Sequence, residues 1–382
     1  HPMGSGQTDL GVLELAGANT FTGGARIEGG ALRITSDANL GAASGALTFA
    51  GGALQVGADI TSNRAVNVAA DGEIAVDAGA TLTLAGVLSG SGALTKAGSG
   101  ALAIAGDASG HTGGIVATGG LLAVDGVLGG PVSVAAGGRL GGNGSVAAVV
   151  NAGVVAPGAS IGVLSVAGDY VGAGGALEIE AALGGDDSPA DRLVIGGDAS
   201  GVTTIRVRNL GGAGALTREG VRIVEVRGAS DGAFVLAGDY MFRGQPAVIA
   251  GAYGYRLHRG GVTDPQDGHW YLRSSLADPA AGDGAGAALP LYQPGVPVYG
   301  SYPRALQALN GLPTLQQRAG NRVWSRAATS SGSGLWARID GARQRVAPAF
   351  PPRARPSTAG RCRRAPTSCW PNATTGRGWW AA

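Results

Sequence analysis

The sequence predicts an all-β fold, a parallel β-helix in which short strands stack as the coils of a solenoid. Two observations carry this prediction. Glycine accounts for 72 of 382 residues, whereas aromatic residues make up only 5% and charged residues 14%. Short apolar-x-apolar units recur along the chain, separated by Gly, Ala, Asn or Asp. Strands this short cannot bury enough surface alone, so they must stack on similar neighbours.

Composition excludes several other classes. Collagen would need a strict Gly-x-y period, and a disordered chain would lack the many Val, Leu and Ile residues found here. A β-sandwich usually has longer strands with more aromatic residues. The net charge is +2 and the charges are scattered, so the sequence predicts no nucleic-acid binding. It has no run of about 18 apolar residues that would predict a transmembrane helix, and no signal peptide is visible after His1.

Residues 1–150 are predicted to form the first part of the β-helix. Residues 11–34 have a partner at 100–124, and both copies contain two apolar-x-apolar units around a Thr-Gly-Gly turn. At about 20 to 25 residues per rung, residues 10–275 would make roughly a dozen rungs. The same unit recurs at Leu47/Phe49, Leu54/Val56, Val66/Val68, Ile74/Val76, Leu82/Leu84 and Val132/Val134.

Residues 151–275 are predicted to be stacked β-structure with a better-filled core. Units at 177–180, 192–195 and 205–208 alternate apolar with polar or charged residues, so one face of each is buried. Four aromatic residues near the end of this segment are interpreted as a cap over the open core, because an uncapped rung would expose apolar surface and sheet edges. They are Tyr253, Tyr255, Trp270 and Tyr271.

The C-terminal part of the chain changes character. Residues 276–303 are predicted to be a linker, because their many prolines lack the amide donor that a sheet ladder needs. A helix is expected at 304–326, where leucines recur at three-residue spacing, and one β-strand at 334–350. Residues 351–382 show no periodicity, and we interpret them as a frame-shifted tail.

One catalytic motif needs consideration. The segment from Gly158 to Gly162 matches the Gly-x-Ser-x-Gly elbow of hydrolases, with Ser160 as the nucleophile. Asp191 and either His258 or His269 follow in the chain order of a hydrolase triad. The elbow requires a helix after the serine, whereas the following segment has the alternation of a strand. We therefore predict a structural turn here, with no catalytic residues and no enzymatic activity.

No cofactor or metal site is predicted. The four histidines lack partners at metal-ligand spacing. Matches to the dinucleotide-binding fingerprint at 142–147 and 282–287 lie outside any βαβ unit. The Gly-Asp pairs lack the nine-residue period of calcium-binding β-rolls.

Together these segments resemble the passenger domain of a bacterial autotransporter, the type V secretion family. The Thr-Phe-Thr-Gly-Gly sequence at 20–24 is similar to the passenger-associated strand repeat, and 110–114 is a weaker copy. Residues 151–275 resemble the autochaperone region of pertactin-like members. The segments that carry this second likeness are 151–170, 190–195, 251–255 and 270–274.

The resemblance implies a right-handed parallel β-helix, then a linker and a pore helix, then the first strand of an outer-membrane β-barrel at 334–350. Because the family's barrel has about a dozen strands, we expect the barrel to be truncated here. The implied function is a surface-displayed stalk or adhesin whose C-terminal segment promotes vectorial folding during secretion across the outer membrane.

The resemblance also implies location and partners. The expected location is the cell surface or outer membrane of a Gram-negative bacterium, or the medium; a chain without the barrel would stay periplasmic or unexported. Expected partners are the outer membrane, through the barrel, and a receptor on a host or bacterial cell, with the chain itself a monomer. The alternative is the passenger of a secreted protease or esterase, with its catalytic part upstream of residue 1 or at Ser160.

Overall fold

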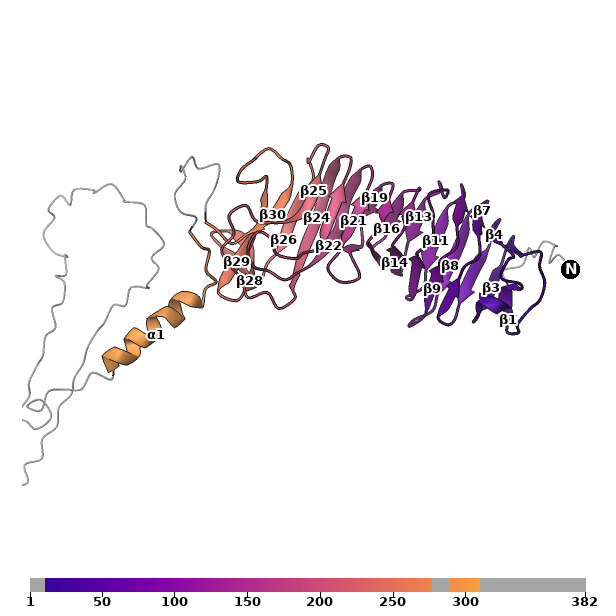
Figure 1. The fold of residues 1–382 in the computed structure, drawn as a ribbon, viewed down its shortest axis with the longest axis horizontal. Helices are drawn as coiled ribbons and strands as arrows, with labels where there is room; N and C mark the ends of the chain where they lie inside the picture. The colour runs from indigo at the N-terminus through magenta and orange to yellow at the C-terminus, as the bar shows by residue number, and fades with distance from the viewer. Residues whose placement is uncertain (1–10, 277–288, 310–382) are drawn as a thin grey trace, which may run out of the picture. The chain divides into compact units, whose positions relative to one another are not determined.

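The computed structural model describes residues 11–276 and 289–309, and the chain divides into two units after Gln293. The first unit is a β-helix built almost entirely of parallel strand pairs (Figure 1). The all-β parallel β-helix predicted from the sequence is therefore confirmed. Residues 334–350 and 351–382, predicted as a barrel strand and a frame-shifted tail, lie outside the described residues.

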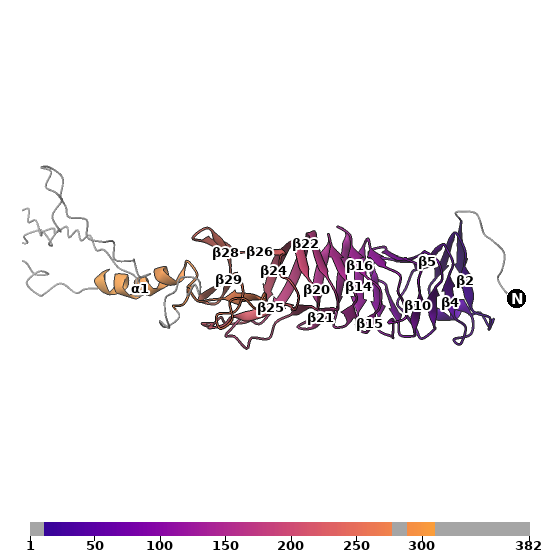
Figure 2. The same ribbon diagram turned by 90° about the horizontal axis from the view of Figure 1, so that it is seen from above.

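Rungs in the middle of the stack contain up to three short strands, and equivalent strands of successive rungs lie side by side (Figure 2). We call the three stacks columns A, B and C. Column A contains β1 (Val12–Leu15), β3 (Ala31–Ile34), β5 (Ala53–Val56), β8 (Gly72–Val76), β11 (Leu94–Ala97), β13 (Ile115–Ala117), β16 (Val132–Val134) and β19 (Val149–Asn151). Column B contains β6 (Ile60–Ser62), β9 (Thr81–Leu84), β12 (Ala101–Ile104), β14 (Gly120–Val124), β17 (Gly138–Gly142) and β20 (Val154–Pro157). Column C contains β2 (Ala25–Ile27), β4 (Leu47–Phe49), β7 (Val66–Val68), β10 (Leu88–Gly90), β15 (Val127–Leu128), β18 (Ser145–Val146), β21 (Val163–Val166), β23 (Arg192–Ile195) and β25 (Val221–Val226).

Columns A and B fuse in the C-terminal rungs. Strand β22 (Tyr170–Ala181) pairs with β19 through its first part and with β20 through its second part. Strand β24 (Ala199–Asn209) pairs along β22, and β26 (Ala233–Ala237) pairs with β24. Each of these rungs therefore has one long strand where earlier rungs have two short ones, so more consecutive residues share one sheet.

An antiparallel sheet closes the C-terminal end of this unit, at the orange end of the β-helix in Figure 1. Strand β25 pairs in parallel with β23 but antiparallel with β30 (Trp270–Arg273). The sheet continues through β29 (Tyr253–Arg259) and β28 (Gln245–Ala250) to β27 (Tyr240–Phe242). Column C thus ends where the pairing changes direction, and we call β27–β30 the cap.

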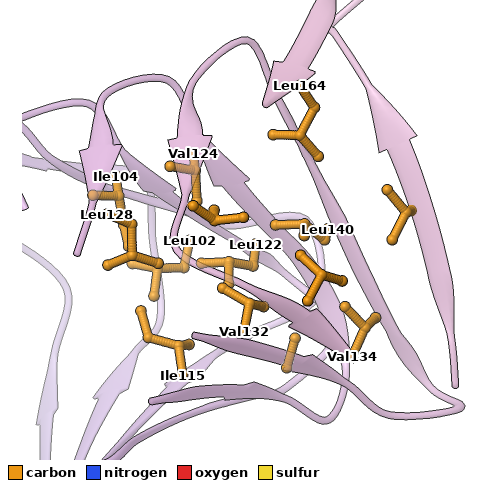
Figure 3. Close-up of a cluster of buried hydrophobic side chains, with 14 of the residues drawn as sticks. Leu102, Ile104, Ile115, Leu122, Val124, Leu128, Val132, Val134, Leu140 and Leu164 are labelled. Carbon is orange, nitrogen blue, oxygen red and sulfur yellow. The ribbon is translucent and has the colours of Figure 1, made fainter. Parts of the chain in front are cut away.

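Inward-facing side chains align from rung to rung because the parallel register repeats. Figure 3 shows part of the core, with Leu102, Leu122 and Leu140 of column B among neighbours from other strands. Burying such a side chain stabilises the fold by about 1.5–3 kcal/mol relative to leaving it exposed. The complete column B ladder is Ile60, Leu82, Leu102, Leu122, Leu140, Val155, Leu177, Ile205 and Leu236, all buried.

Close approach of successive rungs explains part of the glycine content. Gly90 ends β10 with a φ of 112°, and a Cβ atom there would lie 2.2 Å from the carbonyl oxygen of Val68 in the rung below. Only glycine adopts this φ without strain, and any side chain would push the two rungs apart.

The second unit contains one described helix, α1 (Val296–Leu309). It begins inside the segment expected to be a linker (276–303) and before the helix expected at 304–326. The prolines of this segment led to the prediction of a linker in place of the start of the helix. Pro297 lies in the first helical turn, where the N–H that proline lacks would have no partner within the helix. Over residues 11–276 and 289–309, no helix has the length and apolar character needed to cross a membrane.

Candidate functional site

The Gly-x-Ser-x-Gly segment is a turn between β20 and β21. Gly158 has a φ of 82° and forms a bridge to Gly142, and a strand follows the motif where a hydrolase elbow needs a helix. Ser160 is exposed at this turn.

A groove of about 370 Å³ lies beside the turn and contains both Ser160 and Asp191. Its other lining residues are small or apolar ones and paired charges, with Arg139 bonded to Glu178 and Arg208 bonded to Glu180. No histidine is among the described residues that line the groove.

The two candidate histidines lie in the cap. His258 pairs with Tyr271 in the cap sheet, and the Nδ1 atom of His269 accepts a hydrogen bond from the Val226 N–H. The structure therefore brings Ser160 and Asp191 together but adds neither histidine. In the part of the chain that the structure describes, no group of three His, Cys, Asp or Glu side chains could hold a metal ion.

Asp191 is buried and forms a cross-link between a turn and a strand. Its Oδ1 atom accepts a hydrogen bond from the Gly162 N–H at 2.8 Å, and its Oδ2 atom accepts one from the Glu180 N–H at 2.7 Å. Burial raises the pKa of Asp191 to about 6, although these two hydrogen bonds act in the opposite direction. The carboxyl group therefore ties the Ser160 turn to the end of β22.

The aromatic residues near the C-terminus close the core. Tyr255 is fully buried, and its hydroxyl accepts a hydrogen bond from the Ala215 N–H and donates one to the Gly184 carbonyl at 2.7 Å. Phe234 of β26 stacks on Tyr170 at 6.0 Å between ring centroids and meets Trp270 edge-on at 5.2 Å. These rings join the last fused strands to the cap.

Buried polar contacts also lock the cap to the last rungs. Thr217, before β25, and Ser274, after β30, exchange hydrogen bonds: the N–H of each is 2.9 Å from the side-chain oxygen of the other. Arg273 is buried, and its guanidinium donates to the carbonyls of Glu219 and Gly260. The bonds to Thr217 and Glu219 join the cap to the segment before β25, whereas the bond to Gly260 lies within the cap.

A buried polar network lies at the start of the fused rungs. The Asn151 amide donates to the Tyr170 hydroxyl at 2.9 Å and to the Ala176 carbonyl at 3.0 Å. The Tyr170 hydroxyl is also 3.0 Å from the Thr203 hydroxyl. These bonds connect β19, β22 and β24, so the network spans three successive rungs.

The sequence interpretation missed Asn151 and a second buried polar residue, Lys96. The Lys96 ammonium donates to the carbonyls of Ala97 (2.7 Å), Gly98 (3.0 Å) and Gly119 (3.0 Å), and burial lowers its pKa to about 8. A signal was available: Lys96 alternates with Leu94, so both face the core. Asn151 has the same relation to Val149.

Comparison with known proteins agrees with this geometry. Residues 139–257 match the Autochaperone Domain Type 1 family, and residues 7–34 and 94–124 match the passenger-associated transport repeat. The chain belongs to the autotransporter passenger family. The autochaperone match covers the fused strands and extends into the cap.

The passenger is also similar to two autotransporter adhesins. It is 48% identical over 349 residues to the adhesin BmaC autotransporter of Brucella suis biovar 1 (strain 1330), which covers 88% of this chain and 10% of that protein. It is 38% identical over 109 residues to the autotransporter adhesin AIDA-I of Escherichia coli, which covers 28% of this chain and 7% of that protein. The passenger thus spans a small part of the length of these relatives.

Proposed function

We propose that the passenger is a surface-displayed β-helical stalk or adhesin, and that residues 151–275 fold first and act as a template for the other rungs. The observation that carries the proposal is the set of contacts that joins the C-terminal rungs to one another and to the cap. They are the fused strand β22, the antiparallel pairing of β25 with β30, and the paired hydrogen bonds between Thr217 and Ser274.

Nucleation is the costly step for a solenoid. A first rung must order many residues without a neighbour, whereas each later rung adds one interface to an existing surface. The cap supplies the missing neighbour for the last rung through β30, and its polar contacts fix that strand against the segment before β25. A C-terminal template would then order the earlier rungs one after another during export.

The names of the relatives support adhesion as the purpose of the display. Two of them are named as adhesins, and the paired charges around Ser160 do not resemble a catalytic centre. The proposed location is the surface or outer membrane of a Gram-negative bacterium, with a receptor on another cell as partner. In this proposal the segment from 276 to the start of α1 at Val296 links the β-helix to a pore helix, and 334–350 begins the translocator barrel.

Two deletions test the folding role. Removing residues 151–275 is expected to abolish the protease resistance of residues 11–150, whereas removing 11–150 is expected to leave 151–275 resistant. Limited proteolysis with mass analysis of the fragments measures both. Resistance of 11–150 in the first variant would contradict the proposal.

The alternative function, a hydrolase acting through Ser160, makes a different prediction. A Ser160→Ala variant would lose activity towards a p-nitrophenyl ester under that alternative. We expect the wild-type chain and the variant to show the same background rate.

A further inference from the structure

Six acidic or amide side chains at the corners between strands bond to the backbone of the following rung. In each case Oδ1 accepts a hydrogen bond from an N–H that lies 18 to 31 residues later in the chain. We call them the corner acceptors. The pairs are Asp59 with Thr81, Asp71 with Ala93, Asp125 with Asn143, Asn143 with Val163, Asp169 with Asp198, and Asp198 with Ala229.

Four of these bonds form two continuous ladders. Asn143 donates its N–H to Asp125 at 3.1 Å and accepts from the next rung at 3.3 Å. Asp198 likewise donates its N–H to Asp169 at 2.9 Å and accepts from the Ala229 N–H at 2.7 Å. Each ladder therefore ties three successive rungs at one corner.

Glycines make room for the acceptors. The donor residues Val163, Asp198 and Ala229 each follow a glycine, and a Cβ atom on that glycine would lie within 2.3 Å of the acceptor oxygen. The carboxylate or amide oxygen is thus seated in a position that any larger residue would block. This fit indicates a specific contact and not a chance approach of two loops.

The polarity of the bonds is the same in all six pairs: the side chain belongs to the earlier rung and the N–H to the later one. Asp186 follows the same rule, since it accepts from the N–H groups of Arg218 and Gly220. Asn209 and Asp191 are exceptions, because each accepts from a residue earlier in the chain. Asn209 ends the fused strand β24, and Asp191 directly precedes β23.

This polarity suits growth from the C-terminus towards the N-terminus. A folded rung holds its backbone N–H groups in fixed positions, whereas the incoming rung is still flexible. A flexible segment can place one short side chain on a fixed donor before its own backbone is ordered. This contact restricts only a few rotatable bonds, so its cost in conformational entropy is small. In growth from the N-terminus, the incoming segment would have to order its backbone to present the N–H.

We propose that the corner acceptors dock each incoming rung onto the rung already folded on its C-terminal side and set its register. A rung that arrives out of register leaves its acceptor without a donor and the template N–H without an acceptor. The corners are exposed, so the wrong register loses only the modest net stabilisation of each bond, but it loses that stabilisation before the core side chains pack. The inference rests on the proposed template function.

Two substitutions in the full 382-residue chain test the proposal. In Asp198→Ala and Asp125→Ala the acceptor is lost, and we expect the rungs on the N-terminal side of the substitution to gain protease protection about five-fold more slowly during refolding from urea. A protected fragment that starts near residue 198 or 125 and extends to the cap should accumulate first. Pulse proteolysis with mass analysis of the fragments locates that boundary.

Matched controls separate docking from general stability. Asp198→Asn keeps the Oδ1 acceptor and should refold like the wild type. Asp107→Ala removes an aspartate at the same type of corner as Asp125, but its Oδ1 atom accepts from Ser109 within its own turn. This variant should leave the order of protection unchanged.

Two outcomes would overturn the proposal. One is protection that accumulates first on the N-terminal side of the substituted residue. The other is equal slowing of all rungs, with no boundary at residue 198 or 125. The wild-type chain decides the template function separately: if its first protected fragment is not C-terminal, that function fails whatever the variants do.

Discussion

The rungs of residues 11–150 and those of 151–275 use one repeating geometry but differ in what holds each rung together. In the first region, short strands carry aliphatic side chains, and Phe49 is the one fully buried aromatic ring of a described residue. In the second, fused strands, buried hydrogen bonds and the contact between Tyr170 and Phe234 tie each rung to its neighbours. Buried Arg64 and Lys96 also bond to backbone carbonyls in the first region, but among the described residues the fused strands, the aromatic contact and the cap belong to the second.

The difference shows how a repeat protein can have a preferred starting point. If all rungs were equivalent, folding could begin anywhere along the stack. The C-terminal rungs make additional contacts, and these contacts favour the start of folding at that end. The three predictions below test this bias, from the largest expected effect to the smallest.

The same core truncation should destabilise more rungs in the C-terminal region than in the N-terminal region. Leu102→Ala and Leu177→Ala remove the same side chain from the same column B ladder, and each should destabilise its surroundings by about 2–5 kcal/mol. We expect Leu177→Ala to reduce protease resistance throughout residues 11–276, and Leu102→Ala to affect only rungs before residue 102. Urea unfolding combined with proteolysis measures both. Equal loss from the two variants would remove the distinction between the regions.

Asp191 should give the C-terminal region a specific pH dependence. Its pKa is about 6 in the folded chain and 3.8 as the ordinary value, so the folded carboxyl holds a proton that the unfolded one has released. The stabilisation is fully present below about pH 4 and is lost as the pH rises through 6, by up to about 3 kcal/mol. Urea titrations at pH 4, 5, 6 and 7 should show this decline, and Asp191→Asn should remove it.

Asp107 supplies the control of opposite sign. It is exposed, and the hydroxyl and backbone N–H of Ser109 lower its pKa. Its small contribution is present at neutral pH and is lost on acidification. If Asp107→Asn flattens the profile between pH 4 and 6 as strongly as Asp191→Asn, the assignment to Asp191 is wrong.

The buried network should contribute the smallest effect. Tyr170→Phe removes the hydroxyl that joins Asn151 to Thr203, and we expect a loss of about 1 kcal/mol in the free energy of unfolding of the C-terminal rungs. The ring and its contact with Phe234 remain. Tyr299→Phe, on the exposed face of α1, is the matched control and should change nothing. A loss below about 0.3 kcal/mol for Tyr170→Phe would show that the network does not distinguish the two regions.

The sequence predicted the features that depend on alternation. Inward pairs such as Leu54 and Val56 follow from the apolar-x-apolar pattern, and the turn at Ser160 follows from the strand after it. The fused strand β22 was harder to predict because Gly174 and Gly175 resemble turn residues. Whether such glycines end a strand depends on pairing with the neighbouring rung, which a local pattern does not contain.

The antiparallel pairing of the cap and the corner acceptors were missed for a related reason. The aromatic residues indicated a closed end, but the antiparallel pairing of β25 with β30 joins segments far apart in the chain. Aspartates between the apolar units, Asp125 and Asp169 among them, were counted only as separators of those units, since aspartate favours turns on its own account. Their bonds to the next rung depend on a register that only the folded stack defines.

The burial of Lys96 has a practical consequence, because it is the only lysine in the chain. In the folded passenger this lysine amine is buried and is not accessible to an acylating reagent. Modification of Lys96 would require the rung that contains it to open. The fraction of molecules with the added mass would therefore report the fraction that had opened. The passenger therefore carries a single-site chemical reporter that distinguishes closed from open rungs without any label being engineered into it.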